Sequence, residues 1–320
     1  MPKKIQFFLF VLVTCFSVCL CGHTEVCAAK TVQKTSVKKQ AQKKTSAKKK
    51  KKSYKAPAFA DAVFHPEAAQ GDGNVLLDLS GSSQGYVAIE AWSPARLKFQ
   101  VIKGESTYTY DIPSDGTPSV FPLQSGDGLY TFRVMENAVD SEYAQLYAAE
   151  AEIALSDEFQ PYLRPSTYVS YTKDSACVKQ AAKLAKKAEN DVEVVAGVYR
   201  YICGAVAYDY DKAANVQSGY LPDPDDTLAT GMGICFDYAS LAAAMLRSQG
   251  IPTRVIFGYV SPDGLYHAWN MFYTKKTGWV TVGFKADKKT WTRMDLTLAA
   301  NGTDSSFIGD GSNYIDAYCY

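Results

Sequence analysis

The chain has 320 residues, of which 47% are hydrophobic and 13% aromatic, with 22 tyrosines. This length accommodates two ordinary globular domains, and the aromatic content favours β-rich structure. The 34 basic and 33 acidic residues nearly balance. Because no folded region is strongly basic, the charge argues against a nucleic-acid-binding protein.

Residues 1–29 have the pattern of a secretory signal peptide. Lys3 and Lys4 precede an almost unbroken apolar run at positions 5–20, and the small residues near Ala28 offer a cleavage site. An uncleaved membrane anchor is the alternative, although the apolar run is short for a helix that spans a bilayer. We therefore expect a secreted protein, extracellular or associated with the cell surface.

The segment from Lys30 to Lys55 is rich in Lys, Gln, Thr, Ser and Ala. Such a composition cannot bury a core, so residues 30–56 are predicted to be a disordered linker. This linker is either a solvated spacer or a cationic arm that contacts an anionic cell-wall polymer or a membrane surface.

Residues 57–160 are predicted to form an all-β domain. Runs at 86–91, 97–101 and 129–134 alternate with the period of a strand, and Gly-Asp turn formers separate them. Several short strands with frequent turns indicate a small immunoglobulin-like sandwich. The domain has no catalytic grouping, which favours a structural or spacing role. Exposed tyrosines leave a role in binding a wall polymer or a protein open.

Residues 161–320 are predicted to form a second, α+β domain. A linker at 157–171 is followed by helical patterns at 176–188 and 191–204, the second with Asn190 as N-cap and Glu193 as its capping-box partner. An acidic loop region spans 208–228. Strand patterns then predict an antiparallel sheet. They lie at 254–260, 266–273, 279–283 and 291–296.

Cys235 stands at the predicted start of a buried helix. The apolar residues after it recur at the i, i+3, i+4, i+7 spacing of one helical face, and Gly250 and Pro252 end the run. Unpaired N–H groups and the positive end of the dipole stabilise a thiolate at a helix N-terminus. Gly231 and Gly233 allow a sharp turn and are expected to leave room above the sulfur for a substrate.

Candidate partners for Cys235 follow in the order of a catalytic triad. His267 is the only one of the three histidines in the predicted domain of Cys235, and it lies in a strand-like run. Asp295 lies in a later strand-like run. A Cys, a His and an Asp in this order predict nucleophilic catalysis.

The other cysteines and acidic residues predict neither a disulfide framework nor a metal site. Cleavage after the signal peptide leaves Cys177, Cys203, Cys235 and Cys319. With Cys235 as the nucleophile, at most one disulfide can form among the other three. The sequence has no CxxC and no His pair at helical spacing, and the acidic run 223–226 lacks the ordered spacing of a calcium loop. We expect no metal and no cofactor.

Three blocks of sequence together resemble the bacterial transglutaminase-like (transglutaminase/protease-like) superfamily. They are Gly-Ile-Cys-Phe-Asp-Tyr-Ala at 233–239, Leu-Arg-Ser-Gln-Gly-Ile-Pro at 246–252 and His-Ala-Trp-Asn at 267–270. The resemblance covers roughly 175–300. It implies a papain-like α+β core in which the cysteine-bearing helix packs on an antiparallel sheet.

The resemblance also implies a role for each triad residue. Cys235 would be the thiolate nucleophile, His267 would protonate the leaving amine, and Asp295 would orient His267. The backbone N–H of Cys235 would be one oxyanion donor, and Tyr208 is our prediction for the second.

The third triad position has alternatives. The family has a proline after the aspartate, whereas Leu296 follows Asp295 here. Asp287 and Asn270 are therefore further candidates for the residue that orients the histidine.

These observations predict a secreted cysteine-dependent acyl-transfer enzyme that acts on amide bonds of proteins or cell-envelope peptides. A thioester at Cys235 would pass its acyl group to water, as in a peptidase or amidase, or to an amine, as in a transglutaminase. Water is the default acceptor. The alternatives are a catalytically inactive surface-associated binding or scaffold protein, and a redox-sensing thiol in which Cys235 pairs with another cysteine.

Overall fold

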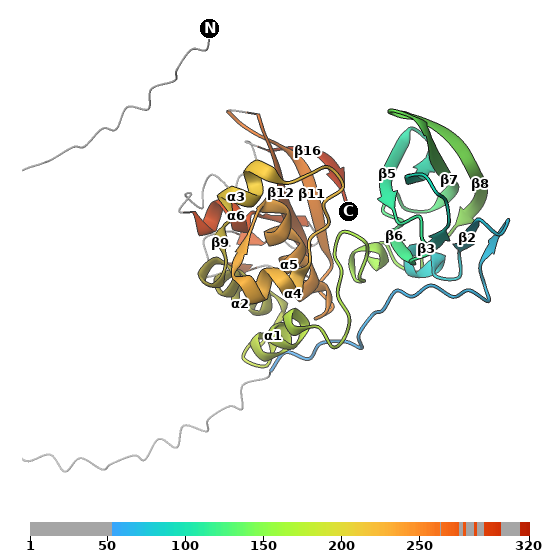
Figure 1. The fold of residues 1–320 in the computed structure, drawn as a ribbon. Helices are drawn as coiled ribbons and strands as arrows, with labels where there is room; N and C mark the ends of the chain where they lie inside the picture. Colours follow the sequence, from blue (N-terminus) through green and yellow to red (C-terminus); the bar gives the residue numbers. More distant parts are fainter. Residues whose placement is uncertain (1–52, 263, 275–277, 280–284, 287–290, 302–313) are drawn as a thin grey trace, which may run out of the picture. The chain divides into compact units, whose positions relative to one another are not determined.

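The computed structural model describes residues 53–262, 264–274, 278–279, 285–286, 291–301 and 314–320 (Figure 1). The predicted signal peptide and the predicted linker up to position 52 lie outside the described residues. Tyr54 is held on the folded chain rather than in a disordered linker, because its N–H donates to the Ala188 carbonyl (2.7 Å) and its hydroxyl to the Gln249 carbonyl (2.8 Å). Within the described part of the chain, no helix is long and apolar enough to cross a bilayer.

Two four-stranded antiparallel sheets form the region predicted as all-β. Their orders are β1-β2-β3-β6 and β5-β4-β7-β8. The strands are β1 (Gln70–Gly71), β2 (Val75–Asp78), β3 (Tyr86–Ala91), β4 (Leu97–Lys103), β5 (Ser106–Ile112), β6 (Ser119–Pro122), β7 (Gly128–Val139) and β8 (Glu142–Ile153). The rings of Phe99 and Tyr110 in one sheet lie 4.9 and 4.5 Å from that of Phe121 in the other. The sheets therefore share a core, and their immunoglobulin-like character stays a prediction.

The segment predicted as a linker between 157 and 171 is packed against the fold. It contains the short 3-10 helix η2 (Gln160–Tyr162), and Tyr162, Val169 and Tyr171 are buried. The N–H and the hydroxyl of Thr167 both donate to the Val120 carbonyl of β6 at 2.9 Å. The segment leaves β8 and is bound to β6 of the other sheet. The predicted domain boundary at 160/161 stays a prediction.

The second half of the chain supplies six described helices. They are α1 (Ala176–Ala185), α2 (Asp191–Ala205), α3 (Tyr210–Asn215), α4 (Pro224–Thr230), α5 (Cys235–Arg247) and α6 (Leu296–Ala300). The predicted helices at 176–188 and 191–204 correspond to α1 and α2. Asn190 caps α2 by accepting from the Glu193 N–H (3.1 Å), but the Glu193 carboxylate accepts from the Glu189 N–H instead of completing the box at Asn190.

The acidic stretch predicted as a loop contains two helices, so that prediction is wrong for α3 and α4. Asp209 accepts from the Lys212 N–H (2.8 Å) and caps α3, and Asp223 accepts from the N–H groups at the start of α4. Asp225 accepts from the first two N–H groups of α1, each at 2.8 Å. The carboxylates that suggested a solvated loop are helix caps.

An antiparallel sheet of order β15-β12-β11-β16 completes the second half. Its strands are β11 (Thr253–Val260), β12 (Leu265–Tyr273), β15 (Trp291–Met294) and β16 (Tyr314–Cys319). The strands predicted at 254–260 and 266–273 are confirmed. The run predicted at 291–296 ends as a strand at Met294, and α6 begins at Leu296. Of the run predicted at 279–283, only Trp279 is described, in β13 (Gly278–Trp279), which pairs with β14 (Lys285–Ala286).

Helix α5 is buried along nearly its whole length and lies on this sheet (Figure 1). Leu241, Met245 and the three alanines between them have essentially no exposed surface. The small alanine side chains let the helix approach the strands closely. The Asn270 side chain fixes the contact by donating from β12 to the Ala239 carbonyl of α5 (2.9 Å). The predicted α+β core, with the cysteine-bearing helix on an antiparallel sheet, is confirmed.

Candidate active site

Cys235 is the first residue of α5, and the chain turns sharply just before it. Helix α4 ends at Gly231, which adopts the left-handed conformation (φ 65°) that favours glycine. A Cβ at Gly233 would lie 2.7 Å from the Cβ of Asp237. The two glycines were expected to leave room for a substrate. Their roles in this structure are to end α4 and to admit the Asp237 side chain.

A short parallel ladder places Tyr208 beside the segment that precedes Cys235. Strand β9 (Ala207–Tyr208) pairs with β10 (Met232–Gly233), and the Asp209 N–H donates to the Gly233 carbonyl (2.9 Å). Burial and then the charge of Cys235 raise the pKa of Tyr208, which places its phenol within electrostatic reach of the sulfur. Register pairs Tyr208 with Gly233, two residues before Cys235, and the oxyanion role of Tyr208 stays a prediction.

His267 and Asp295 form a buried pair. Nε2 of His267 lies 2.9 Å from Oδ2 of Asp295, and the histidine is 4% exposed. The same Oδ2 accepts from the Tyr314 hydroxyl (3.0 Å), while Oδ1 accepts from the Leu298 N–H (3.0 Å) and so caps α6. Three donors thus hold the carboxylate in one orientation, and Asp295 is a helix cap as well as the partner of the histidine.

The surroundings of His267 favour its charged form. Burial lowers the pKa of His267, but hydrogen bonds to Asp295 and to Cys235, with the charges of both groups, raise it to about 10. Because Nε2 faces the carboxylate, Nδ1 is the nitrogen available to the thiol. The structure thus pairs His267 with Asp295 and places Cys235 among the groups that raise the pKa of His267.

The structure describes one of the two alternatives for the third triad position, Asn270. The Asn270 amide donates to the Ala239 carbonyl (2.9 Å) and to the Arg254 carbonyl (3.1 Å), so it joins α5 to β11 and does not orient His267. Asp287 lies outside the described residues.

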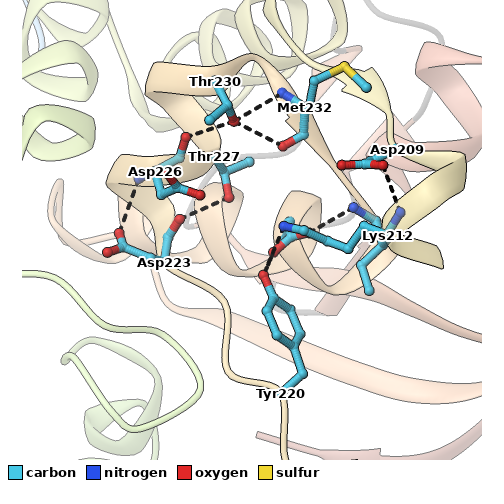
Figure 2. A network of polar contacts seen from close by, with 10 residues as sticks. Asp209, Lys212, Tyr220, Asp223, Asp226, Thr227, Thr230 and Met232 are labelled. Carbon is cyan, nitrogen blue, oxygen red and sulfur yellow. Dashed lines mark hydrogen bonds and ion pairs between the residues drawn. The ribbon is translucent and has the colours of Figure 1, made fainter. Parts of the chain in front are cut away.

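A second buried carboxylate lies in the first turn of α5, and it was not singled out for function from the sequence. Asp237 has no exposed surface, and its Oδ2 accepts from the Ile234 N–H (2.8 Å) and from Nζ of Lys212 (3.1 Å). The Tyr220 hydroxyl donates to Oδ1 of Asp237, and Lys212 Nζ lies 3.1 Å from that hydroxyl oxygen. Figure 2 shows Lys212 and Tyr220 pointing toward one another at this point. The segment 210–220 is thereby fastened to the start of α5.

Polar side chains of α4 hold the turn that joins α4 to β10 (Figure 2). The Thr227 hydroxyl donates to the Asp223 carbonyl and the Thr230 hydroxyl to the Asp226 carbonyl, each at 2.9 Å. The Met232 N–H donates back to the Thr230 hydroxyl (3.3 Å). These bonds hold α4 and the backbone at Met232, three residues before Cys235.

The remaining cysteines and acidic residues form no second centre in the described chain. Cys177, Cys203, Cys235 and Cys319 are all free thiols. Among the residues that the structure describes, no group of three or more His, Cys, Asp and Glu side chains is placed to hold a metal ion. A cavity of about 660 Å³ is lined by residues from 61–64, 118–120, 165–172 and 221–223, away from the three triad residues.

Residues 178–284 match the sequence profile of the transglutaminase-like superfamily. This chain carries a transglutaminase-like domain. The matched range contains Cys235 and His267 and ends before Asp295. Asp295 is therefore placed beside His267 by the geometry of the site and not by the match.

The chain is similar to parts of several known proteins. It is 31% identical to a Mycobacterium leprae protein over 137 residues, which are 40% of this chain and 46% of that protein. It is 37% identical to a Pseudomonas aeruginosa protein-glutamine gamma-glutamyltransferase over 65 residues, which are 17% of this chain and 10% of that protein. The chain spans less than half the length of these relatives.

Solved structures with a similar arrangement include Legionella pneumophila LapG and the transglutaminase of red sea bream. The first is 16% identical with a TM-score of 0.30, over 45% of this chain and 83% of LapG. The second is 12% identical with a TM-score of 0.28, over 66% of this chain and 48% of the fish enzyme. The family match, rather than these structures, identifies the domain.

Proposed function

We propose that the protein is a cysteine-dependent acyl-transfer enzyme that acts on amide bonds of proteins or peptides. The observation that carries the proposal is the buried His267–Asp295 pair, 2.9 Å apart, with Cys235 at the start of α5 among the groups that raise the pKa of His267. A cysteine that only filled a core would not need a charged histidine beside it.

In the proposed reaction the Cys235 thiolate attacks the carbonyl carbon of the amide, and the carbonyl oxygen becomes an oxyanion. The backbone N–H of Cys235 and the Tyr208 hydroxyl would donate to that oxygen. His267 then gives its proton to the amide nitrogen, the C–N bond breaks, and the amine leaves. Asp295 keeps the imidazole oriented and balances its charge while the proton moves.

The second half of the reaction releases the thioester. His267, now neutral, takes a proton from an incoming water or amine, which attacks the thioester carbonyl and expels the Cys235 thiolate. Water gives a carboxylic acid and hydrolysis, whereas an amine gives a new amide and a cross-link. We propose hydrolysis as the main outcome, since water is the acceptor present at the highest concentration.

We further propose that the enzyme is exported and works at the cell envelope. The apolar run at 5–20 and the small residues near Ala28 support export. The lysine-rich segment from Lys30 to Lys55 would hold the enzyme against an anionic wall polymer or membrane surface. Amino-terminal sequencing of protein recovered from the culture medium or the cell surface should show cleavage close to position 29.

The test of the chemistry uses one protein substrate with two readouts. Dimethylcasein is incubated with the enzyme, and new α-amino groups report hydrolysis while covalent uptake of dansylcadaverine reports transfer to an amine. We expect at least one signal from the wild type, reduced roughly 10³-fold or more in Cys235→Ala and His267→Ala. A wild type that changes no protein substrate, and whose envelope binding equals that of Cys235→Ala, would support a scaffold instead.

A further inference from the structure

The face of the β11–β12 sheet that carries α5 extends beyond the end of the helix. Register pairs Val255 with Asn270, Phe257 with Ala268 and Tyr259 with Tyr266, so these residues share one face. Under α5, Val255 and Ala268 are buried and Asn270 bonds to the helix. Helix α5 begins at Cys235, which therefore lies where the covered part of this face gives way to the uncovered part.

The uncovered part is apolar and aromatic. We call it the tyrosine face and define it by five residues: Phe257 and Tyr259 of β11, Tyr266 of β12, and Ile315 and Tyr318 of β16. Register pairs the β16 residues with the same face, opposite Tyr259 and Phe257. The exposed fractions are 46% for Tyr259, 52% for Tyr266, 62% for Ile315 and 47% for Tyr318. Apolar surface gathered in one place on a folded protein marks a contact site.

The tyrosine face begins at the nucleophile. Phe236 follows Cys235 in α5, and its ring lies 4.8 Å from that of Phe257. The contact continues from Phe257 to Tyr266 (6.1 Å) and from Tyr266 to Tyr259 (5.4 Å). Tyr266 also directly precedes His267 in β12. An unbroken row of rings thus leads from Phe236, next to Cys235, out onto the exposed sheet.

The chemistry of the tyrosine face indicates which kind of side chain would bind to it. Its five defining side chains carry no charge, so a charged group placed there would lose water without gaining an ion-pair partner. Aromatic and aliphatic side chains would gain apolar contact, and tyrosine rings add offset or edge-to-face contacts to aromatic partners. An amide placed over Cys235 necessarily carries its flanking residues over the surface next to the sulfur.

We propose that the tyrosine face binds the residues of a polypeptide substrate that flank the reactive amide, and that it selects aromatic or large apolar side chains there. The inference rests on the proposed function, since it assigns the substrate class of the same site. It makes Tyr266 and Tyr259 specificity-determining residues outside the triad.

The experiment compares two electrophiles that alkylate Cys235 in the full-length protein. Chloroacetyl-phenylalanine amide presents an aromatic side chain, and chloroacetyl-glycine amide does not. Intact-mass spectrometry gives a rate for each, and each rate is divided by the iodoacetamide rate of the same variant, which corrects for changes in thiol reactivity. We expect the aromatic probe to be favoured roughly tenfold in the wild type, and roughly threefold or less in Tyr266→Ala and Tyr259→Ala.

Leu129→Ala is the matched control, because Leu129 is also an exposed large apolar residue (55%) but lies in β7, in the other half of the chain. It should keep the wild-type preference. An equal rate for both probes in the wild type, or a preference that survives in both tyrosine variants, would overturn the inference. If iodoacetamide labelling of Cys235 still depends on His267 in that case, the proposed function stands; if labelling is independent of His267, the proposed function itself fails.

Discussion

Oδ2 of Asp295 lies 2.9 Å from Nε2 of His267, and both side chains are buried. In such surroundings a carboxylate stabilises a neighbouring imidazolium far more than it would in water. The pair also selects the nitrogen that reacts, because Nε2 is engaged and Nδ1 is left to Cys235. This hydrogen bond orients the histidine and, together with Cys235, favours its charged form, and both effects are accessible to experiment.

His267→Gln should slow the alkylation of Cys235. An ordinary thiol is only a few per cent ionised at pH 7, whereas a thiol paired with an imidazolium is held as thiolate. We expect the iodoacetamide rate at pH 7 to fall roughly tenfold or more, measured by mass spectrometry of the peptide that contains Cys235. Cys177 and Cys203 provide an internal reference, because burial raises the pKa of each thiol and their slow labelling should not change.

Asp295→Asn should change how stability depends on pH. The pKa of His267 is raised from 6.5 to about 10 in the folded protein. The resulting stabilisation is complete below about pH 6.5, where both states are protonated, and is lost as the pH rises through about 10. The asparagine removes the charge, so the stability gap between wild type and variant should narrow over this range. Urea unfolding from about pH 6 to 10 measures this difference in stability between wild type and variant. A difference that does not change with pH would contradict the role of Asp295 in raising the pKa of His267.

Tyr314→Phe should weaken the site without removing a triad residue. The Tyr314 hydroxyl donates to Oδ2 of Asp295 (3.0 Å), so its loss leaves a buried carboxylate short of one donor. We expect a loss of about 1–3 kcal/mol in the free energy of unfolding and a roughly threefold to tenfold slower alkylation of Cys235, as His267 becomes less well oriented.

Tyr130→Phe is the control that separates an effect on the position of Asp295 from a general loss of stability. The Tyr130 hydroxyl also donates within the fold, to the Gly126 carbonyl (2.8 Å), but in β7, away from the triad. The control should lose stability and keep the wild-type alkylation rate. If Tyr314→Phe behaves in the same way, Tyr314 is structural and does not position Asp295.

The sequence could predict those residues whose secondary structure follows from a local pattern. The helix after Cys235 and the strand around His267 follow from apolar periodicity. Asp295 was predicted in a strand-like run, whereas the strand ends at Met294 and Asp295 caps α6. Tyr314 could not be found in this way, because its link to Asp295 depends on how β16 joins the sheet. The glycines before Cys235 were assigned to the substrate, since a sequence does not show that Asp237 folds back into the space beside Gly233.

The contact between Lys212 and Asp237 should be strongly coupled, and a double-mutant cycle can measure it. The Asp237 carboxylate has no exposed surface, whereas the Lys212 side chain is 27% exposed. Lys212→Met therefore leaves a buried charge without its cation, and removal of one partner of such a pair costs about 3 kcal/mol in the free energy of unfolding. When Asp237→Asn is combined with Lys212→Met, the unpaired buried carboxylate charge is removed as well. The double variant should therefore be more stable than Lys212→Met alone.

The cycle also tests whether segment 210–220 supports the catalytic helix. Hydrogen bonds to Tyr220 and Asp237 outweigh burial and raise the pKa of Lys212, so the ammonium stays charged up to high pH and the contact persists wherever Cys235 can react. If Lys212 fastens the segment to the start of α5, Lys212→Met should slow alkylation of Cys235 and the double variant should restore part of the rate. Unfolding free energies that simply add, with alkylation unchanged throughout, would show that the ion pair stabilises neither the fold nor the position of the sulfur.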